Sequence, residues 1–269
     1  MLVFSDLDRS IIFSNKFIDT DIDYTNIEVY EGKEISYISK FTIDMIREIQ
    51  KNGVFIPTTT RTVDQFDRIG FSEFNIEFQW VIAANGGIIL KDGEVLGSWK
   101  KKVDEILLKS KPIDKVIERF KKYENNPGIL KLRKAEELFF YLVVDLDIFK
   151  LYMIKGFIEE LDSLGWKVYF SGRKIYFLPK GITKENAVKY LSDKIGVDNF
   201  YTIGDSFMDE GMLSMSSNPY TFKHGELAKV AQDKGFALSE LDGMKGTEEV
   251  LKNIIQNDEL SKETNTARA

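Results

Sequence analysis

Three short apolar segments each run directly into a cluster of small polar or acidic residues, and this pattern constrains the fold more than any other. The segments are residues 2–5, 54–56 and 200–203. Short apolar runs of this kind are typical of buried strands, and isoleucines at helical spacing predict a helix over residues 42–52, between the first two. Strands that alternate with helices predict a doubly wound, Rossmann-like parallel sheet, so we assign the chain to the α/β class.

The pattern changes in the middle of the chain, where hairpin signals replace the strand–helix alternation. Lys91-Asp92-Gly93 and Ser171-Gly172 read as hairpin turns, and a helical stretch interrupted by Pro112 lies between them. We therefore expect a small α+β domain inserted into the parallel one. The predicted division is a discontinuous core of residues 1–87 and 179–257, an inserted domain of residues 88–178, and a polar, frayed tail over residues 258–269.

Composition limits the chemistry that this chain can perform. It has no cysteine and a single histidine, which excludes disulfides, a thiolate nucleophile, Cys-ligated zinc and a His-rich metal cage. With 37 Lys and Arg against 43 Asp and Glu, the net charge is −6, so we expect no nucleic-acid partner. No apolar stretch approaches the roughly 18 residues of a membrane span, and the N-terminus does not resemble a secretory signal. We expect a cytoplasmic protein that does not bind membranes.

The carboxyl ends of parallel strands meet at one edge of a sheet, where open α/β sheets bind their ligands. One acidic residue after a strand is more often a helix cap or turn former than a ligand. Here the acidic residues that should converge are Asp6, Asp8, Asp205 and Asp209. Two carboxylates about 4 Å apart repel by about 4 kcal/mol at an effective dielectric near 20, so such a cluster needs a cation. A donor set of oxygen atoms alone suits Mg²⁺.

These motifs, in this order, resemble those of the haloacid dehalogenase (HAD) superfamily of aspartate-nucleophile phosphatases. The inserted segment resembles the larger α/β cap, similar to type IIB, of the branch that contains Cof-type and sucrose-phosphate phosphatases. The resemblance spans residues 2 to about 257. It implies that Asp6 is the nucleophile and Asp8 the general acid and base. It also implies a Mg²⁺ site at Asp6, Asp8, Asp205 and Asp209, with Asp8 contributing its backbone carbonyl.

The remaining motifs of the family give the other predicted catalytic residues and the candidates for substrate contact. The second-motif hydroxyl falls best on Thr59 and the third-motif lysine on Lys184, which completes the predicted catalytic set. Arg9 and Thr60 occupy positions where relatives usually have glycine. The candidates for substrate contact are Arg9, Thr60, Arg61, Asn85 and Arg173. Two of them have a plainer interpretation, since Arg61 could form a surface ion pair and Arg173 could be an exposed turn residue.

The resemblance implies a Mg²⁺-dependent phosphatase that acts on a small phosphorylated metabolite, a sugar or polyol phosphate, through an aspartyl-phosphate. Two alternatives stay open: phosphoryl transfer like that of a phosphohexomutase, and a non-catalytic, stress-associated binding protein that keeps the fold. Oligomeric state cannot be predicted. The hairpin over residues 27–38 is either a flap that touches the substrate or an edge hairpin that only packs.

Overall fold

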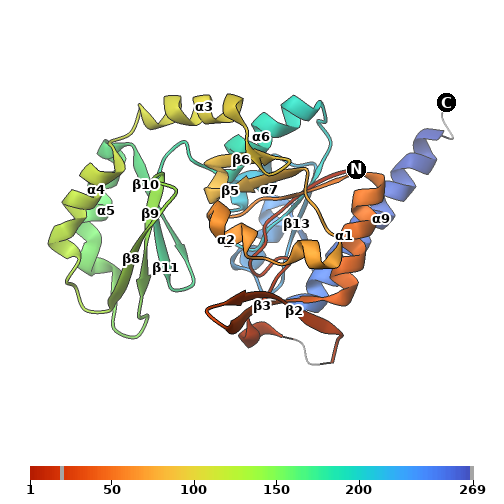
Figure 1. Cartoon of the computed structure of the whole chain (residues 1–269), viewed down its shortest axis with the longest axis horizontal. Coiled ribbons are helices and arrows are strands. Elements are labelled where there is room, and N and C mark those ends of the chain that lie inside the picture. Colours follow the sequence, from red (N-terminus) through yellow and green to blue (C-terminus); the bar gives the residue numbers. More distant parts are fainter. Residues whose placement is uncertain (19–20, 267–269) are drawn as a thin grey trace.

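A parallel sheet of five strands forms the centre of the molecule, which a computed structural model describes for residues 1–18 and 21–266 (Figure 1). Across the sheet the order is β14-β13-β12-β1-β4. The bounds are β1 (Leu2–Ser5), β4 (Val54–Pro57), β12 (Tyr201–Ile203), β13 (Asn218–Thr221) and β14 (Ala237–Leu238). Beyond β4, strand β5 (Trp80–Ala83) continues the sheet through one parallel bridge between Thr58 and Ile82. Strands β6 (Ile88–Lys91) and β7 (Glu94–Val95) pair with it antiparallel.

Helices cover both faces of this sheet because successive side chains of a strand point to opposite sides. Val3 of β1 packs in the cluster that contains residues of α1 (Lys40–Asn52) and α9 (Gly243–Thr266). Leu2 and Phe4, its neighbours in the chain, pack in the other cluster. That second cluster includes residues of α6 (Lys184–Ile195) and α7 (Glu210–Ser214). The predicted doubly wound α/β fold is confirmed.

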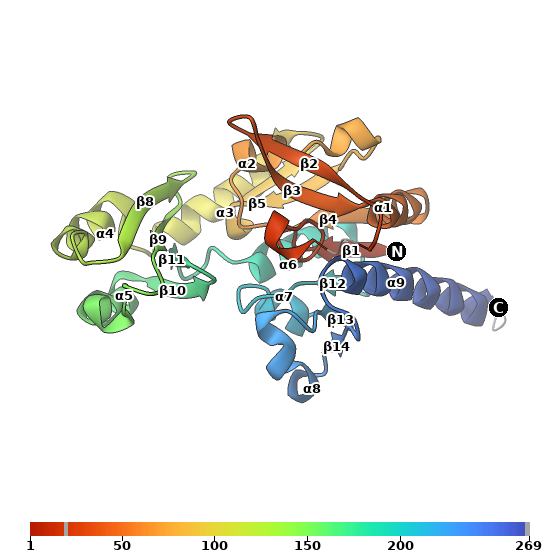
Figure 2. The same ribbon diagram turned by 90° about the horizontal axis from the view of Figure 1, so that it is seen from below.

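A second body lies beside the core and joins it through α3 (Gly97–Leu107) (Figures 1 and 2). Its antiparallel sheet has the order β10-β11-β9-β8. The elements are α4 (Ile113–Phe120), β8 (Ile129–Ala135), β9 (Phe139–Val144), α5 (Lys155–Leu161), β10 (Trp166–Ser171) and β11 (Lys174–Pro179). Four buried phenylalanines form its interior, with ring centroids 4.8 to 5.9 Å apart in the closest pairs: Phe120, Phe140, Phe157 and Phe177. The predicted α+β insertion is therefore present, and its bounds, residues 88–178, stay a prediction.

Smaller elements complete the fold. A separate hairpin of β2 (Tyr24–Tyr30) and β3 (Lys33–Ser39) lies against the core near α2 (Val63–Asp67), and α8 (Ala231–Lys234) precedes β14 (Figure 2). None of the helices in the described part of the chain has the length and hydropathy of a membrane span.

The C-terminal segment differs from the prediction. Residues 258–266, expected to be a frayed tail, continue helix α9. Lys262 supports the helix with an ion pair to Asp258 at 2.7 Å, one turn earlier, and Asp258 also lies 3.8 Å from the terminal amine of Met1. These charged contacts are compatible with a polar helix, which the polar composition alone did not indicate. Residues 267–269 lie outside the described residues.

Candidate active site

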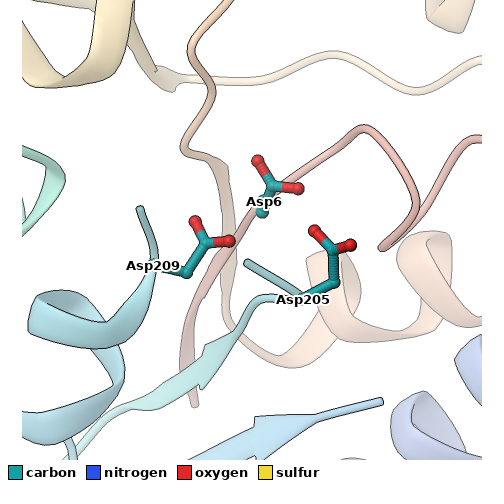
Figure 3. Close-up of side chains that lie close together, drawn as sticks. All are labelled: Asp6, Asp205 and Asp209. Atoms are coloured by element: carbon teal, nitrogen blue, oxygen red, sulfur yellow. The ribbon is translucent and has the colours of Figure 1, made fainter. Parts of the chain in front are cut away.

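Three of the four predicted acidic residues meet at the carboxyl edge of the parallel sheet (Figure 3). Asp6 follows β1 directly, Asp205 lies two residues after β12, and Asp209 is the residue that precedes α7. All three side chains are buried, and one oxygen from each lies within 4.8 Å of the others. The convergence arises from the topology, because β1 and β12 are adjacent parallel strands that end side by side.

Lys184 supplies the positive charge inside this group. It is the first residue of α6, where the Thr183 side chain caps the helix by accepting from the amide of Asn186 at 3.3 Å. The ammonium donates to Oδ1 of Asp6 at 2.6 Å and to Oδ1 of Asp209 at 2.5 Å, and only 1% of the side chain is exposed. Burial disfavours its charged form, but the two carboxylates outweigh burial and raise the pKa of Lys184.

The group as a whole carries excess negative charge. Burial raises the pKa of Asp6 to about 7, and the charge of Asp209 adds to this, while Lys184 opposes it. Burial and the neighbouring Asp6 and Asp209 also hold the pKa of Asp205 well above its usual range. Three carboxylates with one ammonium are therefore short of positive charge. A hard divalent cation ligated by oxygen fits this set of donors.

Asp209 also fixes the loop that follows β12. Its Oδ2 accepts hydrogen bonds from the amide of Ser206 at 3.0 Å and from the Ser206 hydroxyl at 2.8 Å. Gly204 is required by the close packing of this loop, because a Cβ at that position would lie 2.4 Å from the Cβ of Asp209. Both carboxylate oxygens of Asp209 thus have protein partners, so this residue holds Lys184 and the loop in place.

Asp8 lies apart from the three buried carboxylates. Its two oxygens accept from Nε and Nη2 of Arg61 at 2.8 Å each, and about half of its side chain is exposed. Burial of the carboxyl would raise its pKa, but the Arg61 guanidinium outweighs this and holds the pKa of Asp8 below its usual value. The backbone carbonyl ligand predicted from Asp8 stays a prediction.

Arg61 connects Asp8 to the β2–β3 hairpin. It donates to Oε2 of Glu28 at 2.8 Å, and Glu28 also binds Ser36 at 2.6 Å and Arg68 at 3.3 Å. Only 12% of the Arg61 side chain is exposed, so Arg61 forms a mostly buried ion pair instead of the surface pair considered above. Glu28 was not predicted from the sequence, since one acidic residue within a strand pattern gives no signal. The hairpin therefore reaches the site through Glu28.

Arg9 occupies a backbone conformation that favours glycine, with a φ of 64°. Its Nη2 donates to the carbonyl of His224 at 2.6 Å, and its Nη1 lies 3.6 Å from Oδ2 of Asp205. The amide of Gly243 donates to Nδ1 of His224 at 3.0 Å, so Nε2 carries the ring proton and donates to the carbonyl of Arg9 at 2.8 Å. These contacts hold Arg9 in its left-handed conformation.

A cavity of about 400 Å³ opens above these residues, between the core and the second body. The core contributes Asp6, Asp8, Arg9, Thr60, Lys184 and Asp205, and the second body contributes Arg173 of the β10–β11 turn and Lys174, the first residue of β11. Lys174 and the neighbouring Tyr176 were missed from the sequence. Their spacing of two residues on β11 places both on one face of the strand, but nothing in the sequence indicates what that face meets.

Two predicted residues do not line this cavity, and their roles stay predictions. Asn85 is buried in a left-handed turn, and its amide donates to the carbonyl of Ile182 at 3.1 Å, a contact that helps to pack the junction to α6. Thr59 is also fully buried, and its hydroxyl accepts from the amide of Arg61 at 3.1 Å. Thr60 lines the cavity directly.

Sequence comparison relates the chain to phosphate-handling hydrolases. A family profile described as haloacid dehalogenase-like hydrolase matches residues 100–230. A putative phosphatase of Streptococcus pyogenes is 42% identical over 60 residues, which cover 21% of this chain and 22% of that protein. A phosphoglycolate phosphatase of Methanobrevibacter smithii is 29% identical over 140 residues, or 49% of this chain and 56% of that protein. The matches thus span about half or less of these relatives.

Structural comparison covers nearly the whole chain. The sucrose-phosphatase of Synechocystis sp. PCC6803, solved with sucrose and phosphate, superposes with a TM-score of 0.67 at 16% identity, covering 96% of this chain and 98% of that one. A HAD subclass IIB sugar phosphatase superposes with a TM-score of 0.62 at 11% identity, covering 94% and 98%. At such low identity these likenesses establish the shared fold, including the second body.

Proposed function

The chain belongs to the haloacid dehalogenase-like hydrolases, and on that premise we propose that it is a Mg²⁺-dependent phosphatase for a small phosphorylated metabolite of the sugar or polyol class. The observation that carries this proposal is the buried group of Asp6, Asp205, Asp209 and Lys184 at the base of the cavity. The second body, which acts as the cap, supports a small substrate because it covers the cavity and leaves about 400 Å³.

Asp6 is the proposed nucleophile. Its Oδ1 is held by Lys184 and its Oδ2 accepts from the Ser10 hydroxyl at 3.2 Å, so both oxygens are oriented at the end of β1. In the first step a carboxylate oxygen of Asp6 bonds to phosphorus as the bond from phosphorus to the leaving alcohol breaks. Lys184 lies where it can neutralise the phosphoryl oxygens, and its charge favours the ionised form of Asp6 against the effect of burial.

Asp8 is the proposed acid and base. It donates a proton to the leaving oxygen in the first step, and in the second it takes a proton from the water that attacks the aspartyl-phosphate, which regenerates Asp6 and releases phosphate. The ion pair with Arg61 favours the ionised form that the second step requires. In the first step the protonated Asp8 must turn from Arg61 to the leaving oxygen.

The three carboxylates would hold Mg²⁺ chiefly through Asp6 and Asp205, with Asp209 adjacent. When bound, Mg²⁺ supplies positive charge that offsets the carboxylates and the phosphoryl oxygens. The fit rests on donors that are all oxygen atoms and on three buried carboxylates that lie beside a single ammonium, that of Lys184.

A phosphate-release screen over a metabolite panel, with and without Mg²⁺, tests this function. We expect Mg²⁺-dependent release by the wild-type protein and a loss of at least about a thousandfold in Asp6→Asn, since removal of a catalytic nucleophile has effects of this order. Retention of most activity by Asp6→Asn contradicts the assignment. With a hexose 1-phosphate, recovery of an isomeric hexose phosphate without free phosphate would favour the mutase alternative.

A further inference from the structure

The cap presents two cationic side chains to the cavity, and the charge of one of them, Lys174, acts on Asp8. Arg173 and Lys174 lie at the turn between β10 and β11, next to Gly172, which has a φ of 53°. Both side chains are exposed, and within residues 1–18 and 21–266 neither forms an ion pair. Lys174 also lines the smaller space of about 140 Å³ that contains Asp8, Arg61 and Tyr141. The cap wall nearest to Asp8 is therefore positively charged.

The charges deeper in the site balance without these two residues. Asp6, Asp205 and Asp209 would be offset by Lys184 and a bound divalent cation, and Asp8 and Glu28 are offset by Arg61 and Arg68. Arg9, Arg173 and Lys174 then remain as three positive charges around one cavity. A phosphate monoester brings a charge of about −1.5 to −2 at pH 7, so about one positive charge has no counterpart in the phosphoryl group.

The geometry assigns these charges to the leaving group. The phosphorus must lie within reach of Asp6 and Lys184 at the base of the cavity, and the leaving oxygen must lie toward Asp8. The leaving group then extends from Asp8 toward the cap turn. There Arg173 offers a planar guanidinium that can bind a carboxylate or a phosphate with two parallel hydrogen bonds.

We propose that the alcohol released by this enzyme carries an anionic group of its own, a carboxylate or a second phosphate, which binds Arg173 and Lys174 of the cap. This inference rests on the proposed function and narrows its substrate class to acidic phosphate esters. Closure of the cap turn over the anion would bring the cap cations to the substrate and exclude water from the reaction.

Matched substrate pairs test the proposal. We would measure kcat/KM for 6-phosphogluconate against glucitol 6-phosphate, two open-chain esters that differ at the carboxylate. We would also measure it for fructose 1,6-bisphosphate against fructose 6-phosphate, which differ by a second phosphate. We expect at least one acidic member to be preferred by roughly tenfold or more, the usual order for a charge-assisted contact. Arg173→Gln with Lys174→Met should abolish this preference, because kcat/KM of the acidic member falls roughly tenfold more than kcat/KM of the member with a neutral alcohol.

Lys101→Met is the matched control, since Lys101 is an exposed lysine on α3 that does not line the cavity. Equal kcat/KM for both members of each pair, or an equal loss on both in the double variant, would overturn the proposal. Asp6-dependent hydrolysis of the ester with a neutral alcohol would show that the proposed phosphatase function holds even where the anion-binding proposal fails. If no ester is hydrolysed, calorimetric binding of the same pairs to Mg²⁺-loaded Asp6→Asn gives the same comparison: acidic preference supports the proposal, and equal affinity refutes it.

Discussion

Substitution of Asp205 by asparagine should stabilise the metal-free protein at alkaline pH. Carboxylates no more than 4.8 Å apart repel by at least roughly 3.5 kcal/mol per pair at an effective dielectric of 20, and Asp205 faces both Asp6 and Asp209. Arg9, at 3.6 Å, returns roughly 4.6 kcal/mol of attraction. The ionised side chain of Asp205 therefore costs roughly 2 kcal/mol, which Asp205→Asn removes while keeping the shape of the side chain.

The sign of the pH dependence follows from the raised pKa of Asp205. A carboxyl whose pKa is raised by folding destabilises the folded state where it is ionised, and this penalty disappears as the pH falls below the raised value. At pH 8 without Mg²⁺ we expect Asp205→Asn to melt about 4 to 8 °C above the wild-type protein, from roughly 2 to 4 °C per kcal/mol. Near pH 4 the difference should vanish.

Thermal unfolding monitored by circular dichroism, with EDTA or with Mg²⁺, measures both effects. Mg²⁺ at a hundredfold excess over its dissociation constant should stabilise the wild-type protein by about 2.7 kcal/mol, and Asp205→Asn by much less. A lower melting temperature for Asp205→Asn at pH 8 without metal would refute the charge repulsion. Equal Mg²⁺ stabilisation of both proteins would refute Asp205 as a metal ligand.

Three further substitutions probe the supports of the site. Glu28→Gln leaves Arg61 and Arg68 without their buried counter-charge, so urea unfolding should show a free energy of unfolding lower by about 3 kcal/mol. Steady-state assays should show a lower kcat. Unchanged stability and kcat would contradict a link between the hairpin and the site. Arg9→Gly relieves a left-handed backbone conformation that costs about 1 kcal/mol. The substitution also removes a cation, which should weaken substrate binding and raise KM. An unchanged KM would exclude a contact between Arg9 and the substrate. Thr183→Ala removes the N-cap of α6 and should cost about 1 kcal/mol in the same unfolding assay, with no loss at all counting against the cap.

The acidic group could be predicted from the sequence because it depends only on topology. Parallel strands that end side by side bring the residues after them together whatever the details of packing, so Asp6 and Asp205 converge as expected. Strands β8, β13 and β14 were not predicted, because their sequences carry weaker strand signals. β8 is largely exposed at the edge of the cap sheet, and β13 and β14 are short, with Pro219 inside β13.

The pairing of Asp8 with Arg61 could not be predicted, because it depends on where the β2–β3 hairpin places Glu28, thirty-three residues away in the chain from Arg61. The position of Lys174 at the cavity likewise depends on how the cap lies over the core, and no local sequence pattern indicates that arrangement. Asn85 stays a predicted substrate contact. Its amide donates to the buried carbonyl of Ile182, a contact that depends on how the start of α6 packs and has no signal in the sequence.

The most direct test of the central claim is to trap the phosphoryl group on Asp6. Wild-type protein mixed with Mg²⁺ and a hydrolysed phosphate ester would be quenched in acid during the first turnover, digested, and examined by peptide mass spectrometry. We predict a phosphoryl adduct on the peptide that contains Asp6, its absence in Asp6→Asn, and a slower decay of the adduct in Asp8→Asn, where the base of the second step is missing. Phosphate release without an adduct at any time, together with an active Asp6→Asn, would contradict the account.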